Sequence, residues 1–339
     1  MKLSRDKIEE IAVGAVQVIN TGKYVRCYRF TNEQIDLYAK YQDGVFADKT
    51  HYSAGIKLAF NTDSRNLKIK GLASPLGSRS YYAIDVMIND EYKESIKNFI
   101  DSGKNDYFWR TFPLGDFEKD FQLGDGEKKV EIYLPFGVVI DFEEISIDDG
   151  SFIEPVKAKH KGLFFGDSIT QGCDCLYPSK HHMAILSKSL DTNFVNKAIA
   201  GESYNPRLAK LKDDIEPDYI LVAYGTNDWG NGLTLENFTK NCKEFLQFVK
   251  QNYPKAKIFA IAPIWRKDYK DRQVQFDFMM LAQAIKQVVA EIENAIFIDG
   301  FDFIPHSAEF FADSYLHPND MGFKHYAENL YKAIKEKLN

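Results

Sequence analysis

Hydrophobic and polar positions follow two different rhythms along this chain of 339 residues. From residue 160 onward, short apolar runs typical of buried strands are separated by longer stretches with helical spacing. The apolar runs expected to form strands are 163–165, 194–198, 219–224, 258–262 and 295–298. The stretches expected to form helices are about 179–190, 205–213, 234–252, 272–292 and 318–338. Strict alternation of strand and helix predicts βαβ units, and therefore a parallel sheet covered by helices on both faces.

Before about residue 155, short β-rich runs are separated by turn residues instead. The expected strands are 24–30, 55–60, 67–69, 82–88, 129–134 and 138–147. In the second of these, Ile56, Leu58 and Phe60 share one face, which fits a strand with one buried side. This pattern is typical of a β-sandwich. A turn-rich segment at 148–151 marks the boundary, so we expect a β-sandwich domain in residues 1–155 and an α/β domain in residues 156–339.

Composition narrows the class of protein. With 45% hydrophobic and 27% charged residues the chain is an ordinary globular one, and its net charge of −6 argues against a nucleic-acid partner. The first twenty residues contain no apolar segment long enough for a signal peptide, and no run approaches the length of a membrane span. We therefore expect a cytoplasmic protein with no membrane partner. Its four cysteines are too few for a disulfide framework, which favours free thiols.

The chemistry-bearing residues cluster where the predicted strands end. Leu163-Phe164-Phe165 leads directly into Gly166-Asp167-Ser168, so Ser168 lies at the carboxyl edge of the predicted sheet, where open α/β sheets place their sites. Three further blocks follow in chain order: 196–201, 225–228 and 316–320. The first two of these also come just after apolar runs.

These four ordered blocks resemble the SGNH (GDSL-type) hydrolases, which are esterases and acyltransferases named for a Ser, a Gly, an Asn and a His. The resemblance covers roughly residues 160–339 and implies a flavodoxin-like fold without a cofactor. A jelly-roll-like β-sandwich ahead of such a domain is similar in architecture to acetyl esterases of carbohydrate esterase family two. The first 150 residues carry no motif that matches those enzymes.

The resemblance assigns catalytic roles to matching positions. Ser168 is the expected nucleophile and His317 the expected base. Because Pro318 pushes the preceding residue into extended geometry, His317 is held off the final helix and can face the sheet edge. The expected oxyanion hole is formed by the backbone N–H groups of Ser168 and Gly201 and by the side-chain amide of Asn227.

The third member of the triad departs from the family pattern. The usual aspartate stands three residues before the histidine, where this chain has Ser314, and the nearest acid is Asp313. Two alternatives follow: the loop bulges by one residue so that Asp313 still reaches the imidazole Nδ1, or a backbone carbonyl orients His317 in a Ser–His dyad. We favour Asp313.

Other residues near these blocks are weaker candidates. Asp167, Trp229 and Trp265 are candidates for substrate contact, and Trp109 of the first half is a candidate contribution from the sandwich. Two cysteines and two histidines lie within ten residues of one another, which suggests a metal site: Cys173, Cys175, His181 and His182. The Cys-x-Cys spacing lacks the usual zinc-knuckle separation and adjacent histidines rarely face the same point, so we expect no metal.

We therefore expect a serine esterase that acts on a small-molecule ester, with acetylated carbohydrate as the preferred substrate. The substrate expectation rests on family analogy. An acyltransferase that uses the same residues is one alternative, and a carbohydrate-binding protein with a degenerate catalytic domain is another. The oligomeric state stays open.

Overall fold

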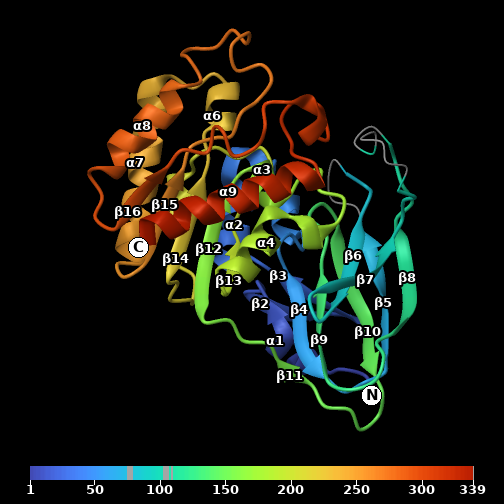
Figure 1. Ribbon diagram of the computed structural model, residues 1–339. Coiled ribbons are helices and arrows are strands. Elements are labelled where there is room, and N and C mark those ends of the chain that lie inside the picture. Colours follow the sequence, from blue (N-terminus) through green and yellow to red (C-terminus); the bar gives the residue numbers. More distant parts are fainter. Residues whose placement is uncertain (75–78, 102–106, 108–109, 339) are drawn as a thin grey trace.

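The computed structural model describes residues 1–74, 79–101, 107 and 110–338. Figure 1 shows a helix-covered sheet on one side and a β-sandwich on the other. In the part of the chain that is described, no helix is both long and apolar enough to cross a membrane.

The second half of the chain forms a five-stranded parallel sheet. In spatial order its strands are β13 (Thr192–Asn196), β12 (His160–Gly166), β14 (Tyr219–Ala223), β15 (Lys257–Ile261) and β16 (Ala295–Ile298). All four neighbouring pairs are parallel. Within this sheet the second strand in chain order, β13, lies at the edge beside β12, and the remaining strands follow on the other side of β12, which is the flavodoxin-like order. The predicted α/β fold is confirmed.

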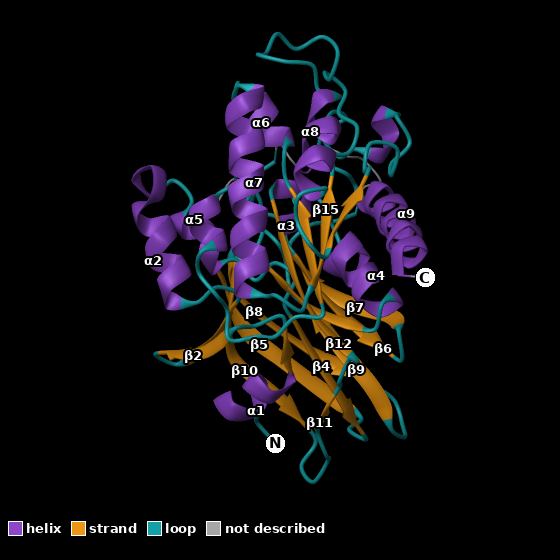
Figure 2. Cartoon of the chain, turned by 90° about the vertical axis from the view of Figure 1, so that its left-hand side faces the viewer, coloured by secondary structure: helices purple, strands orange, loops and turns teal. Residues whose placement is uncertain are grey.

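Helices cover both faces of this sheet (Figure 2). Those on one face are α5 (Pro206–Ala209), α7 (Leu235–Asn252) and α8 (Met280–Val289), and those on the other are α4 (His182–Ser189) and α9 (Asp320–Leu338). Because successive side chains of a strand point to opposite faces, Leu163 and Phe165 pack toward the first group while Phe164 packs toward the second. Both faces are therefore buried, as expected for a parallel sheet.

The first half forms two antiparallel sheets that pack as a sandwich. One sheet has the order β1 (Ala12–Val13), β4 (Lys57–Thr62), β9 (Lys128–Tyr133), β6 (Ala83–Ile88) and β7 (Glu91–Lys97), with β11 (Glu154–Pro155) also paired to β4. The other has the order β2 (Gln17–Thr21), β3 (Tyr24–Tyr28), β10 (Val139–Ile147), β5 (Asn66–Ser74) and β8 (Gly115–Gln122). Side chains from both sheets meet in one apolar core, which confirms the predicted sandwich.

Two helices in the first half were not predicted. The first, α1 (Arg5–Ile11), begins the chain, and the second, α2 (Asn32–Lys40), is followed by the 3₁₀ turns η1 (Tyr41–Gly44) and η2 (Ala47–His51). A capping box between Thr31 and Gln34 starts α2, and this signal is readable in the sequence. Tyr38 of α2 packs into the core of the α/β domain. A segment from the first half therefore completes the core of the second.

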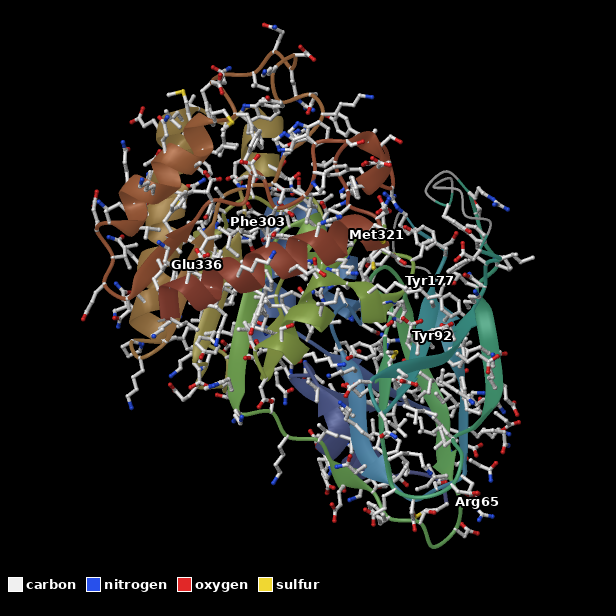
Figure 3. The ribbon with its side chains drawn as sticks, viewed as in Figure 1. Arg65, Tyr92, Tyr177, Phe303, Met321 and Glu336 are labelled. Atoms are coloured by element: carbon white, nitrogen blue, oxygen red, sulfur yellow. The ribbon has the colours of Figure 1, made fainter. Side chains whose placement is uncertain are left out.

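The two halves share buried polar contacts. The fully buried Arg29 donates hydrogen bonds to the carbonyl oxygens of Asn196 and Ala198, at 3.0 and 2.6 Å, and also to those of Lys49 and Tyr52. Further out, the rings of Tyr92 and Tyr177 meet edge to face (Figure 3). The sandwich is thus fixed against the loops that follow β12 and β13.

Candidate active site

The turn after β12 places Ser168 at the start of the short helix α3 (Ser168–Gln171). Gly166 is required there, because a Cβ atom would lie 2.2 Å from Thr170 Oγ1. The Asp167 carboxylate caps α3 by accepting a hydrogen bond from Ile169 N at 2.9 Å. Burial raises the pKa of Asp167 to about 6. Asp167 is only 3% exposed and positions the nucleophile turn, and its contact with substrate stays a prediction.

Ser168, His317 and Asp313 are joined by a chain of two hydrogen bonds. Ser168 Oγ lies 2.9 Å from His317 Nε2, and His317 Nδ1 lies 2.9 Å from Asp313 Oδ2. A carboxylate can only accept, so it favours the tautomer with the proton on Nδ1. Nε2 is then free to accept the proton of the Ser168 hydroxyl.

The loop before His317 absorbs the extra residue in the spacing. Ser314 has a φ of 58°, in the left-handed region, and the chain turns tightly around it. Asp313 Oδ1 accepts hydrogen bonds from the backbone N–H groups of Tyr315, Leu316 and His317 at 2.9, 2.7 and 3.1 Å. Of the two alternatives for the third member, this geometry favours the bulged loop with Asp313.

Electrostatics at the imidazole follow from these contacts. Burial by itself lowers the pKa of His317, but the hydrogen bond to Asp313 and the charges of Asp174 and Asp313 outweigh it, so the net shift is upward. Burial likewise raises the pKa of Asp313, and the bond to His317 reverses the sign to a net decrease. The pair is thus arranged to stabilise an imidazolium facing a carboxylate.

Three hydrogen-bond donors are candidates for the oxyanion hole. The backbone N–H groups of Ser168 and Gly201 have no acceptor among the described residues. Gly201 has a φ of 89°, a conformation that favours glycine. Asn227 Nδ2 donates one hydrogen to the carbonyl of Glu202 at 2.9 Å, which fixes the amide and leaves its second hydrogen available. The set fits an oxyanion hole.

Sequence reasoning missed the residues that hold the Gly201 turn. Lys49 Nζ donates to the Ala200 carbonyl at 2.6 Å, and Gln171 Oε1 accepts from Ala200 N at 2.8 Å. Gln171 also donates to the carbonyl of Phe136 in the sandwich half at 3.1 Å. No motif marks these residues, because each contact joins segments that are distant in the sequence.

A second carboxylate near His317 was also missed. Asp174 Oδ2 lies 3.4 Å from His317 Nδ1, and no motif in the sequence marks this residue. Its neighbours Cys173 and Cys175 were considered in the sequence only as candidate metal ligands. Those cysteines are buried and free, while His181 meets the Phe323 ring edge to face and His182 stacks on it.

The two candidate tryptophans are mostly packed. Trp229 is 1% exposed and its indole N–H donates to the carbonyl of Phe276 at 2.8 Å, so it packs in the core of the α/β domain, and its contact with substrate stays a prediction. Trp265 is 9% exposed and stacks on His306. Trp109 lies outside the described residues.

Comparison with known proteins agrees with this geometry. Residues 164–325 match the model of the family described as GDSL-like Lipase/Acylhydrolase. An arylesterase from Vibrio mimicus is 27% identical over 124 residues, which cover 34% of this chain. The match spans 62% of that relative's length.

Solved structures match over nearly the whole chain. A salicylyl-acyltransferase, SsfX3, from a tetracycline biosynthetic pathway has a TM-score of 0.82 at 20% identity, covering 96% of this chain and 94% of its own. A family two carbohydrate esterase from Clostridium thermocellum in complex with cellohexaose has a TM-score of 0.65 at 13% identity, covering 95% and 99%. At these identities the likeness shows the fold, which includes the sandwich as well as the α/β domain.

Proposed function

We propose that this chain, whose residues 164–325 match the GDSL-like lipase/acylhydrolase family, is a serine esterase that removes acetyl groups from acetylated sugars. The observation that carries the catalytic part is the continuous relay from Ser168 Oγ through His317 to Asp313, with both steps at 2.9 Å. A nucleophile, a base within reach and an orienting acid are the parts that acyl transfer requires.

The proposed reaction has two halves. Ser168 Oγ attacks the ester carbonyl while its proton passes to His317 Nε2, and the oxyanion accepts hydrogen bonds from Ser168 N, Gly201 N and Asn227 Nδ2. The tetrahedral intermediate then expels the alcohol, which takes the proton from His317. Water attacks the acyl-serine with His317 again as base, and the acid leaves as Ser168 regains its proton.

The sugar part of the proposal rests on fold likeness and on the place of the sandwich. The structurally similar family two carbohydrate esterase from Clostridium thermocellum is solved in complex with cellohexaose. In this chain the first half also reaches the site, since Lys49 contacts the turn that carries Gly201. A sugar bound at Ser168 would therefore lie beside residues of both halves.

Transfer to an alcohol acceptor is a second candidate, favoured by the fold shared with the salicylyl-acyltransferase. The same nucleophile, base and oxyanion donors serve both reactions. Adding an alcohol or a free sugar during turnover and analysing the products separates them, since a transferase yields a new ester while an esterase yields only the free acid.

The first experiment compares acetate release from p-nitrophenyl acetate and from peracetylated cellobiose by wild type and Ser168→Ala. We expect Ser168→Ala to lose more than about 10³-fold in kcat. Ser189→Ala, on the outer part of α4, is a matched control that should keep wild-type rates, because its hydroxyl only bonds Ile185 O in its own helix. Turnover that survives in Ser168→Ala, or a wild type inactive on both esters, would overturn the proposal and favour a sugar-binding protein.

A further inference from the structure

Two carboxylates approach the same nitrogen of the proposed base. His317 Nδ1 lies 2.9 Å from Asp313 Oδ2 and 3.4 Å from Asp174 Oδ2. The three groups hold their ligand atoms within 4.8 Å of one another, a spacing that could also suit a cation. The guanidinium of Arg79, however, already lies against Asp174, at 2.6 Å. The cluster is therefore better explained as a holder of the Nδ1 proton.

Asp174 is held rigidly by the first half of the chain. Its Oδ1 accepts hydrogen bonds from Arg79 Nε at 2.6 Å and Tyr81 Oη at 2.8 Å, and its Oδ2 accepts one from a terminal nitrogen of Arg79 at 3.1 Å. Arg79 and Tyr81 come just before β6 of the sandwich. Asp174 is 1% exposed and has a φ of 70°, so both its burial and its backbone are unusual for this residue.

Such an arrangement needs a reason, because a buried ion pair seldom adds net stability over an apolar pair of similar size. Asp174 Oδ2 lies at ion-pair distance, 3.4 Å, from His317 Nδ1, and so places negative charge beside that nitrogen. Negative charge there favours a proton on Nδ1, which is the tautomer a base at Nε2 requires. Arg79 offsets part of the charge of Asp174, so Asp174 stabilises the imidazolium less than an unpaired carboxylate would.

We propose that Asp174 is a positioning residue whose charge, together with the hydrogen bond to Asp313, stabilises the proton on His317 Nδ1, and that Arg79 and Tyr81 of the β-sandwich hold it in place. This inference rests on the proposed function, and it goes beyond it by making the sandwich part of the catalytic machinery.

The first test is the pH dependence of kcat/KM in Asp174→Asn. The charged groups that face His317 are Asp313 on its own loop, Asp174, Arg79 and the capping Asp167. Removing the negative charge of Asp174 destabilises the imidazolium, so the acidic limb moves to lower pH, by about half a unit to one unit. We also expect kcat to fall about tenfold with little change in KM, because the proton holder acts on the chemical step.

Asp141→Asn is the matched control. Asp141 is also a buried aspartate, 3% exposed, and it accepts hydrogen bonds from Arg26 Nε and Nη2 at 2.7 and 2.6 Å, but in the sandwich between β3 and β10. The Asp141→Asn variant should lose stability in the same way while its acidic limb stays in place. An acidic limb that is unmoved in a folded Asp174→Asn protein overturns the inference.

A second test leaves Asp174 intact and so does not depend on the folding of its variant. In Asp313→Asn, the three backbone donors at Oδ1 hold the amide oxygen and turn Nδ2 toward His317 Nδ1, which favours the wrong tautomer. The tautomer is measured by NMR with ¹⁵N-labelled histidine, and the His317→Gln variant identifies the signal of His317 among the seven histidines. In Asp313→Asn we expect a fraction of the molecules to keep the proton on His317 Nδ1. His317 protonated on Nε2 alone would overturn the inference.

The two proposals fail in distinguishable ways. If Ser168→Ala keeps its turnover, the esterase proposal fails, and the tautomer measurement still decides the role of Asp174. If Ser168→Ala is inactive while the acidic limb of Asp174→Asn does not move, only the role of Asp174 is lost.

Discussion

His317 and Asp313 form a direct hydrogen bond of 2.9 Å although four positions separate them where three are usual in the families this chain resembles. The extra residue, Ser314, takes a left-handed conformation, and the Asp313 carboxylate bonds the three backbone N–H groups that follow it. The carboxylate therefore builds the loop with one oxygen and orients the imidazole with the other.

The Asp313→Asn variant should separate these two functions. Asparagine keeps the oxygen that organises the loop, so we expect a change in Tm of only a few degrees. The amide nitrogen would face His317 Nδ1, and kcat should fall about 10³-fold, somewhat less than in a triad with a single carboxylate. Steady-state kinetics beside a thermal melt test this, and a rate near that of wild type would favour the Ser–His dyad.

Asn227→Ala should lower kcat by about 10²–10³-fold with little effect on KM, because the amide acts on the oxyanion of the transition state. Asn231→Ala is a suitable control, since Asn231 ends the same short helix α6 (Thr226–Gly230) and contacts Asn227 only through its backbone. Equal losses in the two variants would mean that the helix, not the amide, had been damaged. Initial rates at saturating and low ester concentration give both constants.

Gly201→Ala tests the second donor. A Cβ atom would meet Phe46 Cε1 at 3.5 Å and Lys49 Nζ at 3.7 Å, which are ordinary contacts, so the strain comes from the φ of 89°. We expect a loss of about 1–2 kcal/mol of stability and a drop of more than about tenfold in kcat, as the turn relaxes and moves the N–H. Gly150→Ala, with a φ of 84° and open space, should cost similar stability and leave kcat unchanged.

Glu202 makes stability depend on pH. It is 1% exposed and accepts hydrogen bonds from Tyr38 Oη, Asn205 Nδ2 and Tyr224 Oη, yet burial raises its pKa to about 7. A carboxyl whose pKa is raised by folding stabilises the folded state below its unfolded pKa, and this stability is lost as the pH rises through the folded value.

We therefore expect the free energy of unfolding to fall between about pH 4.5 and pH 7, and Glu202→Gln to flatten that fall by about 1–3 kcal/mol. Urea unfolding at pH 5 and pH 8 measures it. The exposed Glu328→Gln should keep the wild-type pH dependence. A Glu202→Gln protein with an undiminished slope would show that Glu202 is already charged at pH 5.

Local pattern was enough to determine the α/β half of the molecule. Each apolar run predicted as a strand overlaps one of β12 to β16, and the long helices α7 and α9 begin within two residues of their predicted starts. These elements depend on periodicity and on capping, which neighbouring residues carry. The positions of Ser168 and His317 near the sheet edge follow from the same information, because parallel strands bring their carboxyl ends to one edge.

The tertiary structure decided what depends on contacts between distant segments. The hydrogen bond of Asp313 required Ser314 in a conformation that spacing alone does not specify. The place of Asp174 required Arg79 and Tyr81, more than ninety positions earlier in the chain, and the burial of Trp229 required the carbonyl of Phe276. A sequence pattern records which side of an element is buried, but not which distant side chain covers it, and the groups around His317 are of that second kind.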